Sequence, residues 1–167
     1  MNFFQGDRQA VNFQGDRQAV NNRQRAVRLA RRPLETFLRR AKNELGLEEA
    51  SLTVCLVSDA EIARMNEKFR KKNGPTDVLS FPTVARRRLV RVPRGSKPVK
   101  AGEYLGDIAI SPATARRYAK KNGRKLSSEL QVLILHGVLH LLGYDHETDR
   151  GEMDRVERKL RKRLGLA

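Results

Sequence analysis

The feature that most constrains this chain is an eleven-residue stretch, HGVLHLLGYDH, that holds all three of its histidines. His136 and His140 are four residues apart, which places both imidazoles on one face of a helix. The surrounding segment, residues 128–142, is apolar nearly all round, and a helix of that kind is buried. Two imidazoles inside a buried helix need polar partners, and a metal ion satisfies both.

His146 completes the group, because it follows Gly143, a residue that can end a helix and turn the chain back. Three imidazoles with a fourth position left open are typical of a catalytic zinc site. The sequence therefore predicts one Zn²⁺ per chain on His136, His140 and His146. Asp145 has two interpretations: it orients a ligand imidazole or accepts a proton from water, or it only stabilises the turn.

The charge of the chain indicates what it binds. Lys and Arg number 35 against 19 Asp and Glu, a formal net charge of +16. Such an excess favours a polyphosphate partner, although a solubility surface or binding to anionic lipid remains open. The basic residues are spread over several elements without a bulky aromatic anchor, which favours nucleic acid. Because the chain has no Trp and few other aromatics, we expect contacts mainly with phosphates.

Other classes are disfavoured by what the sequence does not contain. No apolar run approaches the roughly 18–20 residues of a membrane span. The N-terminus lacks a compact apolar segment of the signal-peptide kind, so a cytoplasmic location is expected. Cys55 is the sole cysteine, lies in an apolar run, and is interpreted as a small core residue.

Periodicity and capping signals predict an α+β fold, with a small mixed sheet of about four strands packed with about five helices and the zinc site on a buried helix. The expected strands are residues 52–57, 78–81 and 104–110. The expected helices start near Pro33, at the capping pair Ser58 with Glu61, at Ser111, at the capping pair Ser128 with Gln131, and near Thr148 or Asp149. Residues 83–103 are expected to form a long basic loop or a splayed hairpin.

The nonapeptide FQGDRQAVN occurs twice, at residues 4–12 and 13–21. Two copies are too few for a solenoid, so a local duplication is the simpler interpretation. Residues 1–12 are expected to form a disordered N-terminal extension, and the second copy is expected to supply an edge strand. Residues 13–167 are then one metallohydrolase domain.

Three motifs carry a family resemblance: FRKKNGPTDVLSFP at 69–82, YLGDIAIS at 104–111, and HGVLHLLGYDH. Their order and separation resemble the YbeY family of zinc-dependent endoribonucleases. The resemblance implies a cytoplasmic enzyme that cuts single-stranded RNA in 16S rRNA 3′-end maturation and ribosome quality control. It also implies the small ribosomal subunit, a ribosomal protein or an assembly GTPase as partners. His136, His140 and His146 match the family's zinc ligands, and Arg70 matches its functional arginine.

Arg70 also has a physical rationale of its own. It precedes an Asn-Gly-Pro turn at a helix end, and a guanidinium there can grip two phosphate oxygens and offset charge developing in phosphoryl transfer. The alternative is a solvated surface arginine. With His136 it forms the predicted catalytic pair, while Asp77, Arg116 and Arg117 join Asp145 as candidates for supporting the site or binding RNA.

Two rival functions stay open. The spacing H-x-x-x-H-x-x-G-x-x-H is that of metzincin metalloproteases, but those enzymes carry a Glu general base directly after the first His, where this chain has Gly137. The second rival is a non-enzymatic ribosome-assembly factor with a structural zinc. Structural zinc usually has four protein ligands, and only three are visible in the sequence.

Overall fold

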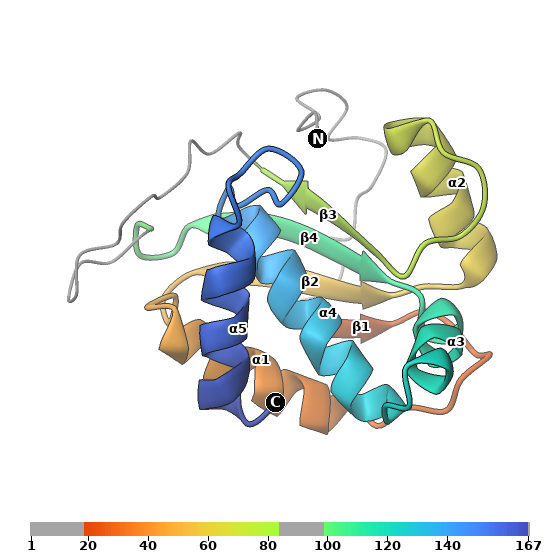
Figure 1. The fold of residues 1–167 in the computed structure, drawn as a ribbon, viewed down its shortest axis with the longest axis horizontal. Helices are drawn as coiled ribbons and strands as arrows, with labels where there is room; N and C mark the ends of the chain where they lie inside the picture. The colour runs from red at the N-terminus through yellow and green to blue at the C-terminus, as the bar shows by residue number, and fades with distance from the viewer. Residues whose placement is uncertain (1–18, 84–98, 167) are drawn as a thin grey trace.

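The structure is a computed structural model that describes residues 19–83 and 99–166. Helices and strands are distributed along this part of the chain as shown in Figure 1. In order they are β1 (Val20–Asn22), α1 (Arg31–Glu44), β2 (Ser51–Leu56), α2 (Asp59–Arg70), β3 (Val78–Pro82), β4 (Tyr104–Ile110), α3 (Pro112–Lys121), α4 (Leu126–Leu141) and α5 (Glu152–Leu164).

The strands form one mixed sheet in the order β1-β2-β4-β3. Strands β1, β2 and β4 are parallel, and β3 runs antiparallel to β4. Strand β1 comes from the end of the second nonapeptide copy and pairs at the sheet edge, with Val20 opposite Val54. The predicted α+β class, the mixed sheet and the edge strand are confirmed, whereas the first copy lies outside the described residues.

Helices cover both faces of this sheet. Ile108 of β4 belongs to a core cluster that also includes Phe37 of α1, Leu135 of α4 and Leu160 of α5. Its neighbour Ala109 belongs instead to a second cluster, with residues of α2. Successive side chains of a strand point to opposite faces, so α1, α4 and α5 lie on one face and α2 on the other.

Helix α4 lies at the centre of the helical layer, in contact with α1, α3 and α5 and with strands β3 and β4 (Figure 1). Its contact with the sheet is close at Gly137, where a Cβ atom would lie 2.7 Å from Cγ2 of Ile108. The predicted burial of this apolar helix is confirmed. The elements on either side therefore surround the two histidines that it carries.

Cys55 confirms its predicted role as a core residue. Its side chain is fully buried on β2. Burial, with a smaller contribution from the charge of Asp107, raises the pKa of the thiol to about 12. A protonated, inaccessible thiol is neither a nucleophile nor a metal ligand.

Most predicted helix starts are confirmed by their hydrogen bonds. Ser58 Oγ accepts from the Glu61 N–H at 3.1 Å, and Ser111 Oγ accepts from the Thr114 N–H at 3.2 Å. The Asp149 carboxylate accepts from the backbone N–H groups of Gly151 and Met153 at the start of α5. These caps satisfy N–H groups that have no partner inside the helix.

The capping pair Ser128 with Gln131 is wrong as the start of α4. The helix begins at Leu126, its capping position is Lys125, and no side chain caps it. Leu126 packs against the main core cluster, and this burial extends the helix one turn beyond the local capping signal. The predicted basic loop falls mostly on residues 84–98, which lie outside the described residues. Within the described ranges, no helix is both long and apolar enough to cross a bilayer.

Candidate metal centre

The three histidines converge as their spacing predicts. Nε2 of His136 lies 3.0 Å from Nε2 of His140, and the two ring centroids are 4.6 Å apart. The His146 ring lies 5.4 Å from each of the other two. One ligand atom from each ring falls within 4.8 Å of the others, so a single ion can contact all three. In the described parts of the chain, no fourth His, Cys, Asp or Glu joins this group.

The turn after α4 delivers the third ligand. The Gly143 N–H donates to His140 O at 3.0 Å, and the Tyr144 N–H donates to Leu139 O at 3.1 Å. Gly143 has a φ of 92°, which an L side chain rarely adopts. This is a Schellman-type helix end, and it reverses the chain so that His146 faces the helix it has just left.

Asp145 shapes the loop that carries His146. It is buried, and its carboxylate accepts from the Glu147 N–H at 3.0 Å and from the Thr148 hydroxyl at 3.2 Å. The turn role that the sequence left open is therefore present. A role of Asp145 toward a metal or a proton stays a prediction.

The outer nitrogens of the two helical ligands are held by acceptors. His136 Nδ1 lies 2.9 Å from Oε2 of Glu157, and His140 Nδ1 lies 2.9 Å from the carbonyl oxygen of Tyr144. A carbonyl oxygen accepts only, and an ionised carboxylate does likewise, so Nδ1 of each ring carries the hydrogen. In the neutral rings both Nε2 lone pairs then face each other at 3.0 Å. Facing lone pairs repel unless a cation lies between them, and these residues therefore fit a bound metal ion.

Electrostatics keep the central ring neutral. Burial, and then the neighbouring His136 and His146, lower the pKa of His140 to about 4. Burial opposes ionisation of Glu157, but the hydrogen bond and charge of His136, together with Arg161, hold the pKa of that carboxyl below its usual value. Zinc is bound by neutral imidazoles such as that of His140. The outer nitrogen of a zinc-binding histidine commonly faces a carboxylate, as Nδ1 of His136 faces Glu157 here.

Glu157 contacts the histidine group and is not among the residues predicted from the sequence. It lies on α5, and its second oxygen pairs with Arg161 Nε at 3.5 Å. A signal for it does exist in the sequence. Within α5 it shares the inward face with Met153, Leu160 and Leu164, and an acidic residue on an apolar face needs a buried partner.

Arg70 lies beside the loop that carries His146, and its phosphate-binding role stays a prediction. It is the last residue of α2, and its Nη2 lies 3.4 Å from Oε1 of Glu147, the residue that follows His146. Lys71, with a φ of 55°, ends the helix. The structure thus brings together two segments that are separated by more than seventy residues in the chain.

The other predicted site residues lie elsewhere. The Asp77 carboxylate accepts from the Val78 N–H at 2.9 Å, where β3 begins. Arg117 of α3 pairs with Asp59 at 2.9 Å, and Arg116 is exposed on the same helix. Figure 1 shows α3 beside the start of α4, whereas His136 and His140 lie in the second half of α4. The RNA-binding roles of these residues stay predictions.

Gly137 stands at the position where metzincin peptidases carry their general base, and close packing explains why it is glycine. A Cβ atom at this position would meet Ile108 at 2.7 Å, since the backbone of α4 lies directly on the sheet there. A side chain at this position would require the Ile108 side chain to move. The position that carries Glu in metzincins is therefore filled by a packing contact here, which counts against the metalloprotease hypothesis.

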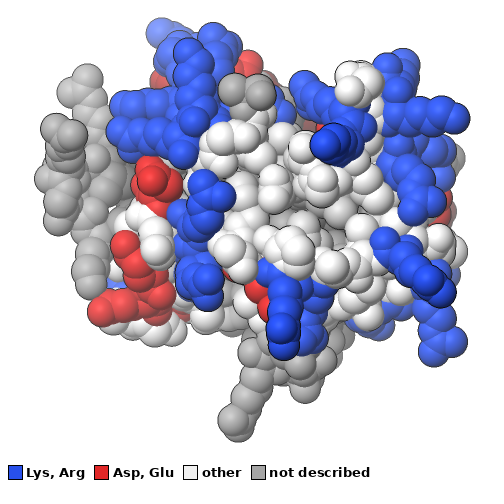
Figure 2. Space-filling view, turned by 90° about the horizontal axis from the view of Figure 1, so that it is seen from below, with Lys and Arg blue, Asp and Glu red and all other residues white. Residues whose placement is uncertain are grey.

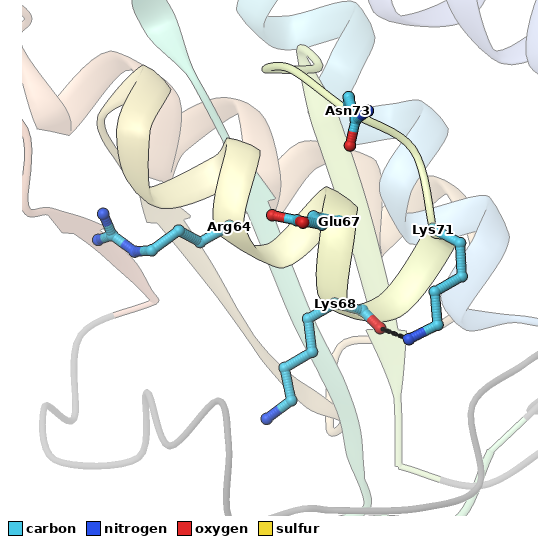
Figure 3. Close-up of a pocket in the computed structure, with 5 residues that line it drawn as sticks. All are labelled: Arg64, Glu67, Lys68, Lys71 and Asn73. Atoms are coloured by element: carbon cyan, nitrogen blue, oxygen red, sulfur yellow. Dashed lines mark hydrogen bonds between the residues drawn. The ribbon is translucent and has the colours of Figure 1, made fainter.

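Basic side chains extend well beyond the metal centre. Figure 2 shows Lys and Arg in several groups around the face seen from below, with the visible Asp and Glu gathered mainly on the left. A separate hollow of about 510 Å³ lies along α2 and contains none of the three histidines. Figure 3 shows that its side chains spread outward from the helix instead of converging on one point. The residues that line it are Arg64, Glu67, Lys68, Lys71 and Asn73.

Comparison with known proteins agrees with this geometry. The family model described as endoribonuclease YbeY matches residues 12–165. A protein named endoribonuclease YbeY from Solibacter usitatus is 42% identical over 144 residues, covering 86% of both chains. Its namesake from Koribacter versatilis is 43% identical, covering 80% of this chain and 76% of its own. That from Aquifex aeolicus is 39% identical and covers 76% of each.

The fold is also found in a solved structure. The solution structure of TM1509 from Thermotoga maritima superposes with a TM-score of 0.55 at 25% sequence identity. The match covers 87% of this chain and 88% of that one. With the family match over nearly the whole length and three relatives near 40% identity, the chain belongs to the YbeY family.

Proposed function

We propose that this chain is a zinc-dependent endoribonuclease that cuts single-stranded RNA, acts in 16S rRNA 3′-end maturation and takes part in ribosome quality control. Membership of a family described as endoribonuclease YbeY supports RNA cleavage. The observation that supports the metal is the pair of facing Nε2 atoms of His136 and His140, 3.0 Å apart with both Nδ1 atoms engaged.

The three histidines would hold the ion, with His136 and His140 oriented by their outer partners. When bound, zinc supplies Lewis-acid chemistry: it polarises a phosphoryl oxygen and lowers the pKa of water toward ~7. The remaining work falls to the protein. Glu157 keeps the His136 ring in one tautomer, and the buried turn at Asp145 holds the loop that carries His146.

Arg70 would stabilise the charge that develops on the phosphate. In the structure its guanidinium pairs with Glu147 at 3.4 Å, and the Glu147 side chain is exposed. An RNA phosphate that reaches the histidines would compete with this carboxylate for the same donors. Exposed ion pairs contribute little to stability, so replacing the Glu147 carboxylate by a phosphate costs little free energy. Arg70 would then bind the phosphate that is cleaved and stabilise the negative charge that develops on it.

The wider setting follows from charge and family. A formal charge of +16 supports a polyanionic partner, in keeping with ribosomal RNA on the small subunit. A cytoplasmic location and contacts with a ribosomal protein or an assembly GTPase belong to the same proposal. The attacking group is either water or the ribose 2′-OH.

The test is cleavage of single-stranded RNA from the 16S 3′ region by purified protein. We expect cleavage that stops on chelation and returns with stoichiometric zinc, and that is much weaker on the same RNA in a duplex. An RNA with one 2′-deoxy residue at the cut site distinguishes the two nucleophiles, because only attack by the 2′-OH is then blocked. Chelator-insensitive cleavage, or casein digestion without RNA cleavage, would contradict the proposal.

A further inference from the structure

We propose that the outward face of α3 is a second contact surface for single-stranded RNA, where Tyr118 stacks on an unpaired base and the neighbouring cations bind phosphates. The identity of the ligand rests on the proposed endoribonuclease function. The surface itself rests on exposure and charge, and it is separate from the histidine group.

Tyr118 is unusual for its exposure. It is 43% exposed, and among the described residues it is the one large hydrophobic side chain exposed to this degree. Ala115 and Ala119 of the same helix are buried, so Tyr118 lies at the edge of the buried side of α3. The exposed part of its ring is accessible to a planar partner.

The charge around this ring has one sign. Residues 112–128 contain no Asp or Glu, and their cations are Arg116, Arg117, Lys120, Lys121, Arg124 and Lys125. Arg117 pairs with Asp59, and Arg124 pairs with Glu129. The other four cations are exposed and have no acidic partner within 4.0 Å in the described parts of the chain.

The spacing of these cations lowers the stability of α3. Arg116 with Lys120, and Arg117 with Lys121, are like-charge pairs four residues apart on one helix. Such like-charge pairs destabilise a helix. A polyanion laid along this face removes the repulsion, so the arrangement suits a bound state with phosphates better than the free protein.

The geometry lets one RNA strand reach both sites. Helix α3 packs against the start of α4, and His136 lies ten residues beyond Leu126 in the same helix. At about 1.5 Å per residue this is roughly 15 Å along the axis. Binding sites for single strands span about 4–16 nucleotides, so a strand cut at the histidines can continue to α3.

Single-stranded RNA fits this surface better than an acidic protein segment does. Either polyanion satisfies the lysines, but every unpaired nucleotide offers a π-face to the exposed ring, whereas Asp and Glu side chains offer none. A duplex hides its bases, and α3 lacks the wide apolar face of a membrane-binding helix. We therefore commit to a single strand as the occupant, with an acidic peptide as the competitor to be tested.

The test is fluorescence anisotropy with a labelled single strand of about 15 nucleotides and the full-length protein in chelator, so that binding is measured without cleavage. Tyr118→Ala should weaken binding about tenfold, whereas Tyr118→Phe should stay within about twofold because the ring remains. Lys120→Ala with Lys121→Ala should weaken binding and lower the salt slope by about 2. Lys159→Ala, an exposed cation of α5, is the control and should have a small effect.

Cleavage assays separate this proposal from the proposed function. In zinc-loaded protein, Tyr118→Ala should raise KM for the long strand at unchanged kcat, and leave a strand of about four nucleotides unaffected. If the wild type binds and cuts RNA but both α3 variants bind like the wild type, the α3 surface is wrong and the endoribonuclease stands. Wild type that binds no RNA overturns both. Equal competition by an acidic peptide of matched charge overturns the choice of RNA.

Discussion

The two ends of α4 are built in opposite ways. At its C-terminal end, His140 is buried and His136 is half-buried, and the outer nitrogen of each is engaged by Tyr144 or Glu157 at 2.9 Å. At its N-terminal end, the adjoining α3 exposes one aromatic ring and the cations Arg116, Lys120 and Lys121, which have no acidic partner within 4.0 Å among the described residues. One end holds its imidazoles with specific hydrogen-bond partners, and the other borders a charged surface.

Under the proposed function, the difference separates the residues for chemistry from those for binding. A metal site needs ligands held within a fraction of an ångström, so its rings are fixed by hydrogen bonds and packing. Binding to an RNA backbone needs charge and reach, and loosely held side chains suffice. Substitutions at the two ends should therefore fail in different assays, and the following tests use that separation.

The largest effect should come from His140→Ala. Losing one of three ligands should abolish stoichiometric zinc and reduce cleavage by more than about a hundredfold, because even partners of ligands are worth 10–100-fold. RNA binding measured by anisotropy should stay within about twofold, since the charged surface is intact. Elemental analysis and circular dichroism check metal content and folding. A folded variant that cuts RNA without zinc would break the comparison.

Arg70→Ala tests whether this residue acts on the reacting phosphate or only in RNA binding. If Arg70 stabilises charge on the reacting phosphate, kcat should fall about 10²–10³-fold with zinc content unchanged. Arg70→Lys should recover only part of it, because an ammonium lacks the bidentate geometry of a guanidinium. Glu147→Gln is the matched control, as it removes the ion pair and keeps the guanidinium. A rise in KM alone would place Arg70 with the binding surfaces.

Glu157→Gln tests whether Glu157 orients His136 as a metal ligand. Replacing the carboxylate that faces His136 Nδ1 should weaken zinc affinity about 10–100-fold, measured by competition with a chromogenic chelator. Asp154→Asn, on an exposed position of the same helix, is the control and should leave affinity unchanged. Equal affinities for both variants would show that Glu157 does not orient the ligand.

The smallest effect is the pH dependence of zinc-free stability. The pKa of His140 is about 4 in the folded protein against 6.5 for the unperturbed group. Between these values the unfolded chain binds a proton that the folded chain does not, so stability falls as pH drops from 6.5 toward 4. The slope from this group is at most about 1.4 kcal/mol per pH unit. Urea unfolding of chelated protein should show it, and His140→Gln should flatten it; an unchanged slope would assign the dependence to other groups.

Prediction from sequence succeeded where the sequence signal is local. The i, i+4 spacing of His136 and His140 implies a shared helix face by helix geometry alone, and Gly143 supplies the conformation that turns the chain. It failed at the start of α4, where the local signal at Ser128 lost to the packing of the partly buried Leu126 two residues earlier. Packing energy over several residues exceeds the contribution of one cap.

The sequence by itself determined which residues can bind a metal, that their helix is buried, and that the chain carries a large positive charge. Only the tertiary structure decided that Glu157 stands behind His136 and that Arg70 meets the loop of His146. Those contacts join segments far apart in the chain. Their physical basis is the packing of α5 against α4 and of α2 on the other face of the sheet, which no local period or spacing encodes.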